Sequence, residues 1–241
     1  MASIIRRVDL RGQRFDSTRA NELVPRAAID IGMAVEQIRP LLEDVRARGQ
    51  AAVVQVTVER DGVDPRPIRV ETNELEAALA SLDPKLKTAI QTSIHRVRAV
   101  SEATLPTAVT VELAEGAKVH QRWVPVDSVG LYVPGGKAVY PSSVIMNVVP
   151  AQAAGVPRLA VATPAQKEFG GRPHPTVLAT AAMLGVTDVF CMGGPAAIAA
   201  FAYGLPEVGL EPVNLVTGPG NIYVAAAKRA LRGTIGIDSE A

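Results

Sequence analysis

The 241-residue chain carries 25 Lys and Arg against 24 Asp and Glu, so its formal net charge is +1. A balance this close to neutral, without a basic run, leaves no electrostatic footprint for nucleic acid. Hydrophobic residues make up 48% of the chain, which is long enough to bury a core without disulfides or metal. The composition predicts a folded protein whose partners are small molecules.

Cysteine content and the length of the apolar runs argue against two further classes of protein. Cys191 has no partner for an internal disulfide, and the N-terminal residues are too few and too polar for a secretory signal. Pro150, Gly155 and Pro157 break the longest apolar stretches, well short of the roughly 20 residues that cross a bilayer. We expect a cytoplasmic protein with no membrane partner.

Residues 1–121 are charged throughout and are expected to fold mainly into amphipathic helices. Apolar residues recur at three-to-four spacing in three stretches, 35–45, 75–82 and 86–100. Gly49 is expected to end the first helix, Thr72 or Asn73 to cap the second, and Asp83 and Pro84 to open the third. Short strands are expected at 53–58, 68–70 and 109–113.

Residues 122–238 differ in character, because charges thin out and short apolar runs alternate with Ala-rich stretches. Strands are expected at 128–133, 158–162, 188–192, 213–216 and 234–237. Helices are expected between them, at 142–154, 175–184, 196–203 and 221–231. Right-handed crossovers then give a parallel sheet with helices on both faces. The fold class is α/β, with a parallel-sheet domain over 122–238 that follows the region 1–121.

Ligands of an open parallel sheet bind beyond the carboxyl ends of its strands, so the turns after the strands matter most. Several of these turns are rich in Gly or Pro, namely 133–136, 163–164, 193–194 and 217–221. Glycine lets backbone amides approach a pyrophosphate, and a following helix adds the positive end of its dipole. Gly and Pro also simply end strands, and no GxGxxG run follows a strand. Only the four turns together favour a nucleotide site.

Each polar side chain at this edge has both a structural and a functional interpretation. Tyr132 could lie against adenine or ribose, or it could pack in the core with its hydroxyl satisfied. Asn221 could cap the last helix, or it could direct its amide to a ribose hydroxyl or a phosphate. Asp238 and Glu240 are either an acid pair near the site or solvated carboxylates.

No metal or nucleophile constellation is expected in this sequence. His95, His120 and His174 are far apart and share no ligand spacing with Cys191. A thiol inside a buried strand has little thiolate character. We therefore assign neither a catalytic residue nor a metal ligand to this chain.

Longer runs of the sequence resemble histidinol dehydrogenase. In the second region they are Arg122-Trp123-Val124-Pro125-Val126, Val129-Gly130-Leu131-Tyr132-Val133-Pro134-Gly135-Gly136, Tyr140-Pro141-Ser142-Ser143-Val144, Met146-Asn147-Val148-Val149-Pro150-Ala151 and Gly218-Pro219-Gly220-Asn221-Ile222-Tyr223-Val224. Val8-Asp9-Leu10-Arg11-Gly12 and Gly236-Ile237-Asp238 extend the resemblance to both ends of the chain.

This resemblance implies a zinc-dependent homodimer at the end of histidine biosynthesis. Such an enzyme oxidises L-histidinol through L-histidinaldehyde to L-histidine, using two NAD in succession. The resemblance also implies two incomplete Rossmann-like domains, of which the first is completed by sequence that follows the second. Residues 1–120 should then expose a surface that receives it. NAD contacts are implied at Tyr132 and Asn221, and Pro134 and Gly194 would line the same crevice.

The chain departs from the family pattern in two ways. Where the family usually has Gly-Gly-Ala-Gln-Ala, residues 193–197 read Gly-Gly-Pro-Ala-Ala, so Ala196 replaces an NAD-contacting glutamine. Loss of that amide would weaken NAD binding by about 0.5–1.5 kcal/mol. The family's zinc ligands, its Glu-His general-base pair and its substrate-binding serine all lie beyond residue 241.

Three hypotheses follow. The first is a histidinol dehydrogenase fragment that holds the cofactor residues and is inactive without its zinc-bearing remainder. The second is a paralogous zinc- and NAD-dependent dehydrogenase of another small amino alcohol or diol, for which Ala196 is the marker. The third is a non-catalytic module that binds a nucleotide or dimerises.

Overall fold

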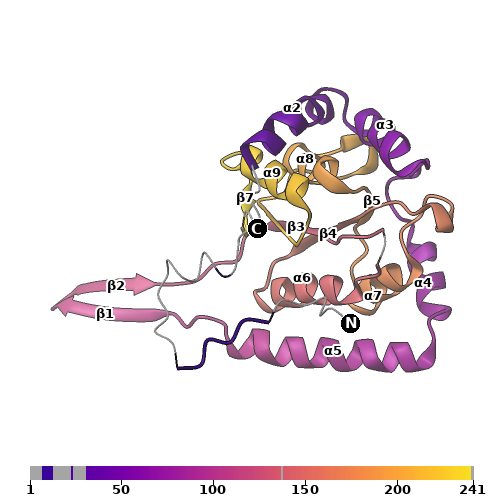
Figure 1. Ribbon diagram of the computed structural model, residues 1–241. Helices are drawn as coiled ribbons and strands as arrows, with labels where there is room; N and C mark the ends of the chain where they lie inside the picture. Colours follow the sequence, from indigo (N-terminus) through magenta and orange to yellow (C-terminus); the bar gives the residue numbers. More distant parts are fainter. Residues whose placement is uncertain (1–6, 13–22, 24–30, 137, 240–241) are drawn as a thin grey trace. The chain divides into compact units, whose positions relative to one another are not determined.

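The computed structural model describes residues 7–12, 23, 31–136 and 138–239. The chain forms two compact units, residues 1–30 and residues 31–241. In the first unit, Arg11 donates hydrogen bonds to the carboxylate of Asp9 within a short turn. The sheet and its helices belong to the second unit (Figure 1).

A five-stranded parallel sheet, in the order β5-β4-β3-β6-β7, forms the centre of the second unit. Its strands are β3 (Ser128–Tyr132), β4 (Arg158–Thr163), β5 (Val189–Cys191), β6 (Leu215–Thr217) and β7 (Gly236–Ile237). Val129 pairs with Leu159 of β4 and with Leu215 of β6, so β3 has a partner on each side. The strands predicted for residues 122–238 are confirmed, with ends shifted by two residues or fewer.

Helices between the strands cover both faces of the sheet (Figure 1). They are α6 (Pro141–Ala153), α7 (Pro175–Met183), α8 (Gly194–Tyr203) and α9 (Ile222–Leu231), with short 3₁₀ turns η1 (Lys167–Phe169) and η2 (Pro206–Val208). Leu131 and Val161 belong to the core on the α6 and α7 side. The alternate residues Tyr132 and Ala162 belong to the core on the α8 and α9 side. This two-sided burial explains why the strands read as continuous apolar runs, and the predicted α/β class is confirmed.

The helices that precede the sheet add an outer layer to each face. They are α2 (Ile31–Arg48), α3 (Gln50–Asp61), α4 (Thr72–Ala80) and α5 (Pro84–Ala103). Helix α2 packs on α9 and α8, α3 on α8, α4 on α7, and α5 on α6. The division of the chain between residues 121 and 122 stays a prediction. Among the described residues, the structure has no helix both long and apolar enough to cross a membrane.

Residues 53–58 lie in α3, so the strand predicted there is wrong. Val53 and Thr57 are both buried and lie one helical turn apart, and the Thr57 hydroxyl donates to the Val53 carbonyl at 2.8 Å. The β-branched residues favour a strand locally. Their four-residue spacing lets one helix face bury against α8, and this packing overrides the local preference.

Residues 68–70 run antiparallel along the outer edge of β5. The Val70 amide donates to the Val189 carbonyl at 2.8 Å, and the Cys191 amide donates to the Ile68 carbonyl at 2.6 Å. The strand predicted here is reduced to a single bridge, between Arg69 and Phe190. These bonds cover an edge that would otherwise expose unpaired backbone groups.

Arg172 ties the loop after β4 to the N-terminal helices. Its guanidinium donates to both carboxylate oxygens of Glu74, at 2.7 and 2.8 Å, and to the carbonyl of Pro67 at 2.5 Å. Burial opposes ionisation of Glu74, but the hydrogen bonds from Arg172 and Glu71 and the charge of Arg172 outweigh it and lower the pKa of this carboxyl. Glu74 is therefore charged at neutral pH and fixes α4 to the loop.

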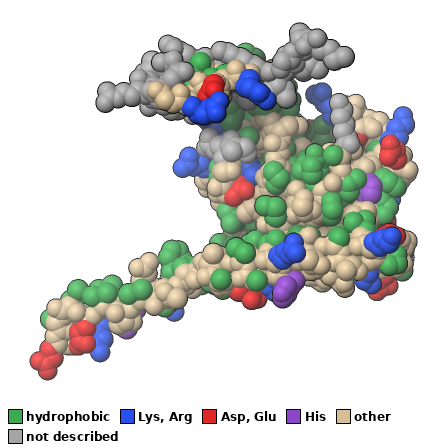
Figure 2. Space-filling model, turned by 60° about the horizontal axis from the view of Figure 1, so that its bottom comes forward, with side chains coloured by type: hydrophobic (Ala, Val, Ile, Leu, Met, Phe, Trp, Pro, Cys, Tyr) green, Lys and Arg blue, Asp and Glu red, His purple; other side chains and the backbone are tan. Residues whose placement is uncertain are grey.

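A hairpin of β1 (Val109–Ala114) and β2 (Ala117–Gln121) projects from the body of the second unit (Figures 1 and 2). Its residues alternate between two faces. One face carries the exposed side chains of Val109, Val111 and Val119. On the other, Thr110 and His120 share a hydrogen bond of 2.9 Å. The expectation that residues 1–120 expose a surface that receives further sequence stays a prediction.

We expect the stability of the protein to depend on the protonation of His174. This residue caps α7, because its Nδ1 accepts a hydrogen bond from the Thr176 amide at 3.1 Å. Burial lowers the pKa of His174 below its ordinary value of 6.5, while the charge of Glu168 opposes the shift. The folded state thus binds fewer protons than the unfolded state, so the cap contribution is complete above the ordinary pKa and is lost as the pH falls below it.

Urea unfolding at a series of pH values tests whether protonation of His174 destabilises the protein. Between about pH 7.5 and about pH 5 the free energy of unfolding should fall by about 1 kcal/mol more in the wild type than in His174→Asn. Asparagine retains the cap but does not titrate. Equal pH dependence in both proteins would contradict the prediction.

Candidate functional site

The strand order reverses next to β3, since β4 and β5 follow on one side while β6 and β7 lie on the other. In open parallel sheets a ligand crevice forms outside the carboxyl ends of the strands at such a reversal. The turns 133–136, 163–164, 193–194 and 217–221 follow β3, β4, β5 and β6 and meet at this end of the sheet, here called the carboxyl edge. The sequence prediction that these turns lie at one edge is confirmed.

Gly218 packs directly on the end of β3. Its φ is +121°, and a Cβ atom built there would lie 2.1 Å from the carbonyl oxygen of Tyr132. Asn147 of α6 joins the same two strands, because its Nδ2 donates to the Tyr132 carbonyl at 3.3 Å and its Oδ1 accepts from the Thr217 hydroxyl at 2.8 Å. The ends of β3 and β6 are therefore held at a fixed separation.

Lys228 and Asp238 bind both backbone groups of Gly218. Lys228 Nζ donates to the Gly218 carbonyl at 2.5 Å and to Asp238 Oδ1 at 2.7 Å. Asp238 Oδ2 accepts from the Gly218 amide at 3.0 Å. The Lys228 side chain is only 1% exposed. Asp238 is thus an ion-paired carboxylate whose side chain remains 34% exposed, in keeping with the expectation of a solvated carboxylate, and Glu240 lies outside the described residues.

Tyr132 takes the structural role that the sequence left open. Its side chain lies in the core on the α8 side, and its hydroxyl accepts a hydrogen bond from the Gly194 amide at 3.1 Å. Burial raises the pKa of Tyr132 above its usual value, although the bond from Gly194 opposes this. The hydroxyl thus fixes the start of α8 at the carboxyl edge. A contact of this ring with NAD stays a prediction.

Asn221 caps α9. Its Oδ1 accepts from the amides of Tyr223 and Val224, at 3.0 and 3.2 Å. The residue is exposed, and the cap uses only its oxygen. The capping role is confirmed, while the predicted contact of the amide nitrogen with NAD is compatible with it and stays a prediction.

Two glycines of the carboxyl edge face open space. Gly136 and Gly194 have positive φ, of +107° and +58°, and a Cβ atom at either would meet nothing within 4 Å. Pro134 is half-buried at the same edge, whereas Ala196 is buried in the core on the α8 side. Backbone at the first three positions can be approached by a ligand. Ala196 has no polar side-chain atom for the predicted NAD contact, which stays a prediction.

Thr163 supplies one further feature that suits a polar ligand near this edge. It ends β4, is 1% exposed, and its hydroxyl has no hydrogen-bond partner among the residues that the structure describes. A buried hydroxyl without a partner costs about 1–3 kcal/mol. The carboxyl edge therefore combines open glycines, an exposed amide and an unsatisfied hydroxyl, which together fit a nucleotide.

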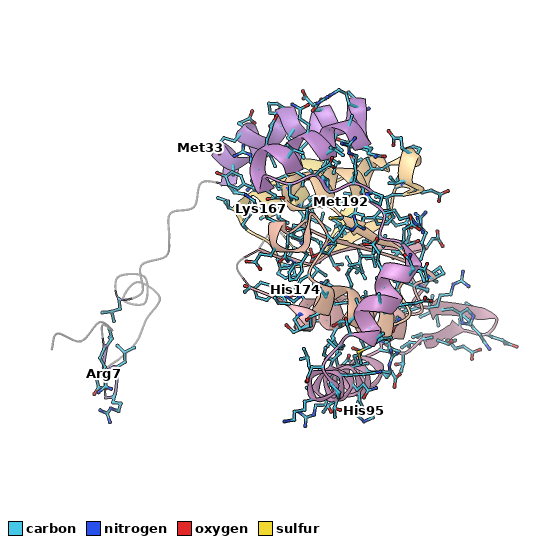
Figure 3. All side chains as sticks on the ribbon, turned by 90° about the vertical axis from the view of Figure 1, so that its right-hand side faces the viewer. Arg7, Met33, His95, Lys167, His174 and Met192 are labelled. Atoms are coloured by element: carbon cyan, nitrogen blue, oxygen red, sulfur yellow. The ribbon has the colours of Figure 1, made fainter. Side chains whose placement is uncertain are left out.

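Within the described ranges, no three His, Cys, Asp or Glu side chains are grouped so that they could hold a metal ion. His95 of α5 and His174 lie well apart in Figure 3, and His120 is in the hairpin. Cys191 is buried, its thiol lies 3.1 Å from the Gly171 carbonyl, and burial raises its pKa to about 12. The interpretation of Cys191 as a buried thiol inside a strand is confirmed, and the raised pKa agrees with little thiolate character.

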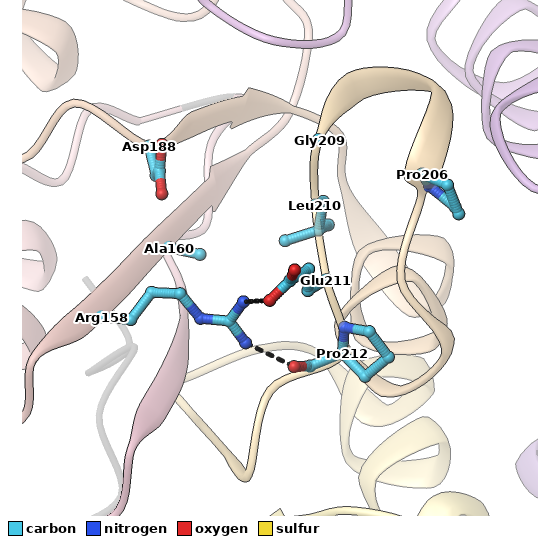
Figure 4. A pocket seen from close by; sticks show the side chains of 8 residues that line it. All are labelled: Arg158, Ala160, Asp188, Pro206, Gly209, Leu210, Glu211 and Pro212. Atoms are coloured by element: carbon cyan, nitrogen blue, oxygen red, sulfur yellow. Dashed lines mark hydrogen bonds and ion pairs between the residues drawn. The ribbon is translucent and has the colours of Figure 1, made fainter.

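A hollow of about 480 Å³ lies at the opposite end of the sheet, at the amino ends of β4 and β5 (Figure 4). Arg158 lines it and donates to the Glu211 carboxylate and to the Pro212 carbonyl, each at 2.5 Å. The guanidinium of Arg158 is therefore already paired within the protein. A second hollow, of about 670 Å³, follows β7 along residues 232–239.

The model of the histidinol dehydrogenase family matches residues 24–241. The chain belongs to the histidinol dehydrogenase family. Histidinol dehydrogenase of Thermobifida fusca is 57% identical over 100% of this chain and 54% of its own length, and that of Leifsonia xyli is 50% identical over 97% and 54%. The chain therefore spans about half the length of these curated relatives.

A solved structure of the family has the same fold. The crystal structure of histidinol dehydrogenase from Elizabethkingia anophelis is 30% identical and matches with a TM-score of 0.81. The match covers 90% of this chain and 49% of that one. The similarity thus extends beyond the sheet to most of the helices packed on it.

Sequence reasoning missed the residues that hold the carboxyl edge together. Lys228 occupies a place in the apolar stripe of α9, between the buried Val224 and Leu231. A lysine at a core position of a helix is a signal that a charged partner lies nearby. Asn147 carries a similar signal, since it lies next to the buried Val148 in α6.

We expect Gly218→Ala to destabilise the protein more than Gly233→Ala. Gly233 is a matched control, because its φ of +97° is similar but a Cβ there would meet nothing within 4 Å. The control should lose about 1–2 kcal/mol through backbone strain alone. Gly218→Ala should lose about 1–3 kcal/mol more because its methyl group collides with the Tyr132 carbonyl. Urea unfolding measures both, and equal losses would mean that the close approach at Tyr132 is unimportant.

Proposed function

We propose that the complete protein carrying this sequence is a histidinol dehydrogenase. It oxidises L-histidinol through L-histidinaldehyde to L-histidine with NAD, as the last activity of histidine biosynthesis. The observation that carries this proposal is the identity of 57% and 50% with relatives of that name, over nearly all of this chain. Two oxidations of one carbon need an acceptor at each step, and NAD supplies it by accepting a hydride.

The carboxyl edge is proposed as the NAD site. Gly136 and Gly194 let the backbone of two turns approach a pyrophosphate, and the start of α9 adds the positive end of a helix dipole. Asn221 donates its amide hydrogens to ribose or phosphate while its oxygen keeps the cap. Pro134 lines the crevice, and Tyr132 acts by fixing α8 through Gly194.

Zinc and the reacting groups are assigned to the remaining half of the family sequence. The described residues hold no candidate metal cluster, and the relatives have nearly as much sequence again as the part matched here. The exposed apolar face of the β1-β2 hairpin suits docking of that half onto residues 1–121. This arrangement, a homodimer and a cytoplasmic location belong to the same proposal.

Ala196 favours a second candidate, a paralogue that oxidises another small amino alcohol or diol. The glutamine amide implied by the family is replaced here by a methyl group buried against the core. A comparison of kcat/KM for L-histidinol with that for other small amino alcohols and diols separates the two candidates. A preference for L-histidinol supports the first. Absence of turnover with all of them, in a correctly folded complete protein, favours a non-catalytic module.

Asn221 provides a direct test of the proposed NAD site. In the complete protein, Asn221→Ala should lose both the cap and the NAD contact, whereas Asn221→Ser keeps a capping oxygen and loses only the contact. Both variants should bind NAD about 3–10-fold more weakly in calorimetric titrations, since one hydrogen bond is lost. Only Asn221→Ala should also unfold at a lower temperature. Wild-type affinity in Asn221→Ser would leave Asn221 with its capping role alone.

A further inference from the structure

No role was assigned to Lys228 from the sequence, although the structure buries its side chain. We propose that Lys228, paired with Asp238, is a positioning residue that acts on the NAD site through the main chain of Gly218. The proposal rests on the function proposed above, because it concerns the same site.

The ion pair binds both backbone polar groups of one residue, Gly218, and so holds the peptide units on either side of it. The ammonium of Lys228 donates to the Gly218 carbonyl, while the Asp238 carboxylate accepts from the Gly218 amide. Asp238 is also bound at 2.7 Å by Lys228 and at 2.7 Å by the amide of Ser239. The orientation of Gly218 is therefore set by side chains from α9 and from the end of β7, and not by the loop itself.

Without the hydrogen bonds from Lys228 and to Asp238, few interactions would restrain the backbone of residues 218–221. Two of its residues, Gly218 and Gly220, are glycines, which have the widest choice of backbone conformations. Asn147 holds Thr217 on one side of the loop, and the cap at Asn221 holds the other. The pair fixes Gly218 between these anchors. Pro219 and Gly220 then remain as an exposed, preorganised tip at the carboxyl edge.

Stability alone does not explain a lysine at this place. Val224 and Leu231 flank it on the buried face of α9, and a leucine there would continue the apolar stripe. The Lys228 side chain is 1% exposed whereas that of Asp238 is 34% exposed. Burying the ammonium costs solvation, and replacing such buried charges with apolar groups of similar volume is often neutral or stabilising. What an apolar side chain cannot do is bind the Gly218 carbonyl and hold the peptide in one orientation.

The test uses the complete protein and two variants of the pair. Lys228→Met keeps the length of the side chain and removes the ammonium, but it leaves a partly buried carboxylate without its cation. The double variant Lys228→Met/Asp238→Asn removes that unpaired charge, and its Asn oxygen can still accept from the Gly218 amide. The double variant should therefore regain thermal stability while lacking the bond to the Gly218 carbonyl.

Arg69→Met is the matched control. Arg69 forms an ion pair with Asp188 at the amino end of β5, at the opposite end of the sheet from the proposed NAD site. Removing it breaks an ion pair of the same fold without touching the loop 218–221. It should lower the unfolding temperature and leave the NAD affinity within about twofold of wild type.

Calorimetric NAD titration and thermal unfolding are measured for all four proteins. We expect the Kd for NAD to rise about tenfold or more in both Lys228 variants, including the double variant with restored unfolding temperature. Wild-type NAD affinity in that double variant would overturn the positioning role. Failure of the wild-type protein itself to bind NAD would instead overturn the proposed function, and with it this inference.

Steady-state kinetics give a second test, because a purely structural role of the Lys228–Asp238 pair would not change the KM for NAD selectively. In the double variant the KM for NAD should rise while the KM for the alcohol stays near its wild-type value. An equal fall in activity at all NAD concentrations, with both KM values unchanged, would mean that the pair supports folding and not the loop.

Discussion

The pairing of β3 with β4 on one side and β6 on the other is the constraint on which the rest of the second unit depends. Because these strands are parallel, each connection must cross from one end of the sheet to the other, and helices on both faces make the crossings. The same pairing brings the carboxyl ends of the strands together and reverses the strand order beside β3. The outer helices α2 and α4 then pack on a frame that is already fixed.

Gly218 is the residue at which the constraints of the carboxyl edge meet. It approaches the end of β3 more closely than any side chain would allow, and its amide and carbonyl are both bound by the Lys228–Asp238 pair. Asn147 and Tyr132 extend the same framework to α6 and α8. Most of the polar side chains at this edge are therefore occupied in holding backbone. This leaves the open turns and the amide of Asn221 as the groups available to the proposed ligand.

The β1-β2 hairpin and the carboxyl edge are consistent with a chain that spans about half the length of its curated relatives. Helices cover both faces of the sheet, and the turns of the proposed cofactor site all follow its strands. In contrast, the hairpin exposes the apolar side chains of Val109, Val111 and Val119. Under the proposed function, cofactor binding lies at the carboxyl edge and docking of the remaining half at the hairpin.

The sequence by itself determined the α/β class, the strands of residues 122–238 and helices such as α5, because burial repeats at fixed local spacings. It also indicated the family through long runs of residues. Only the tertiary structure decided that residues 53–58 are helical, since packing against α8 outweighs the preference of β-branched residues. It likewise decided that Tyr132 binds Gly194 and that Lys228 meets Asp238 and Gly218. These partners come from elements far apart in the sequence. Contacts between them produce no repeating pattern of residues from which they could be predicted.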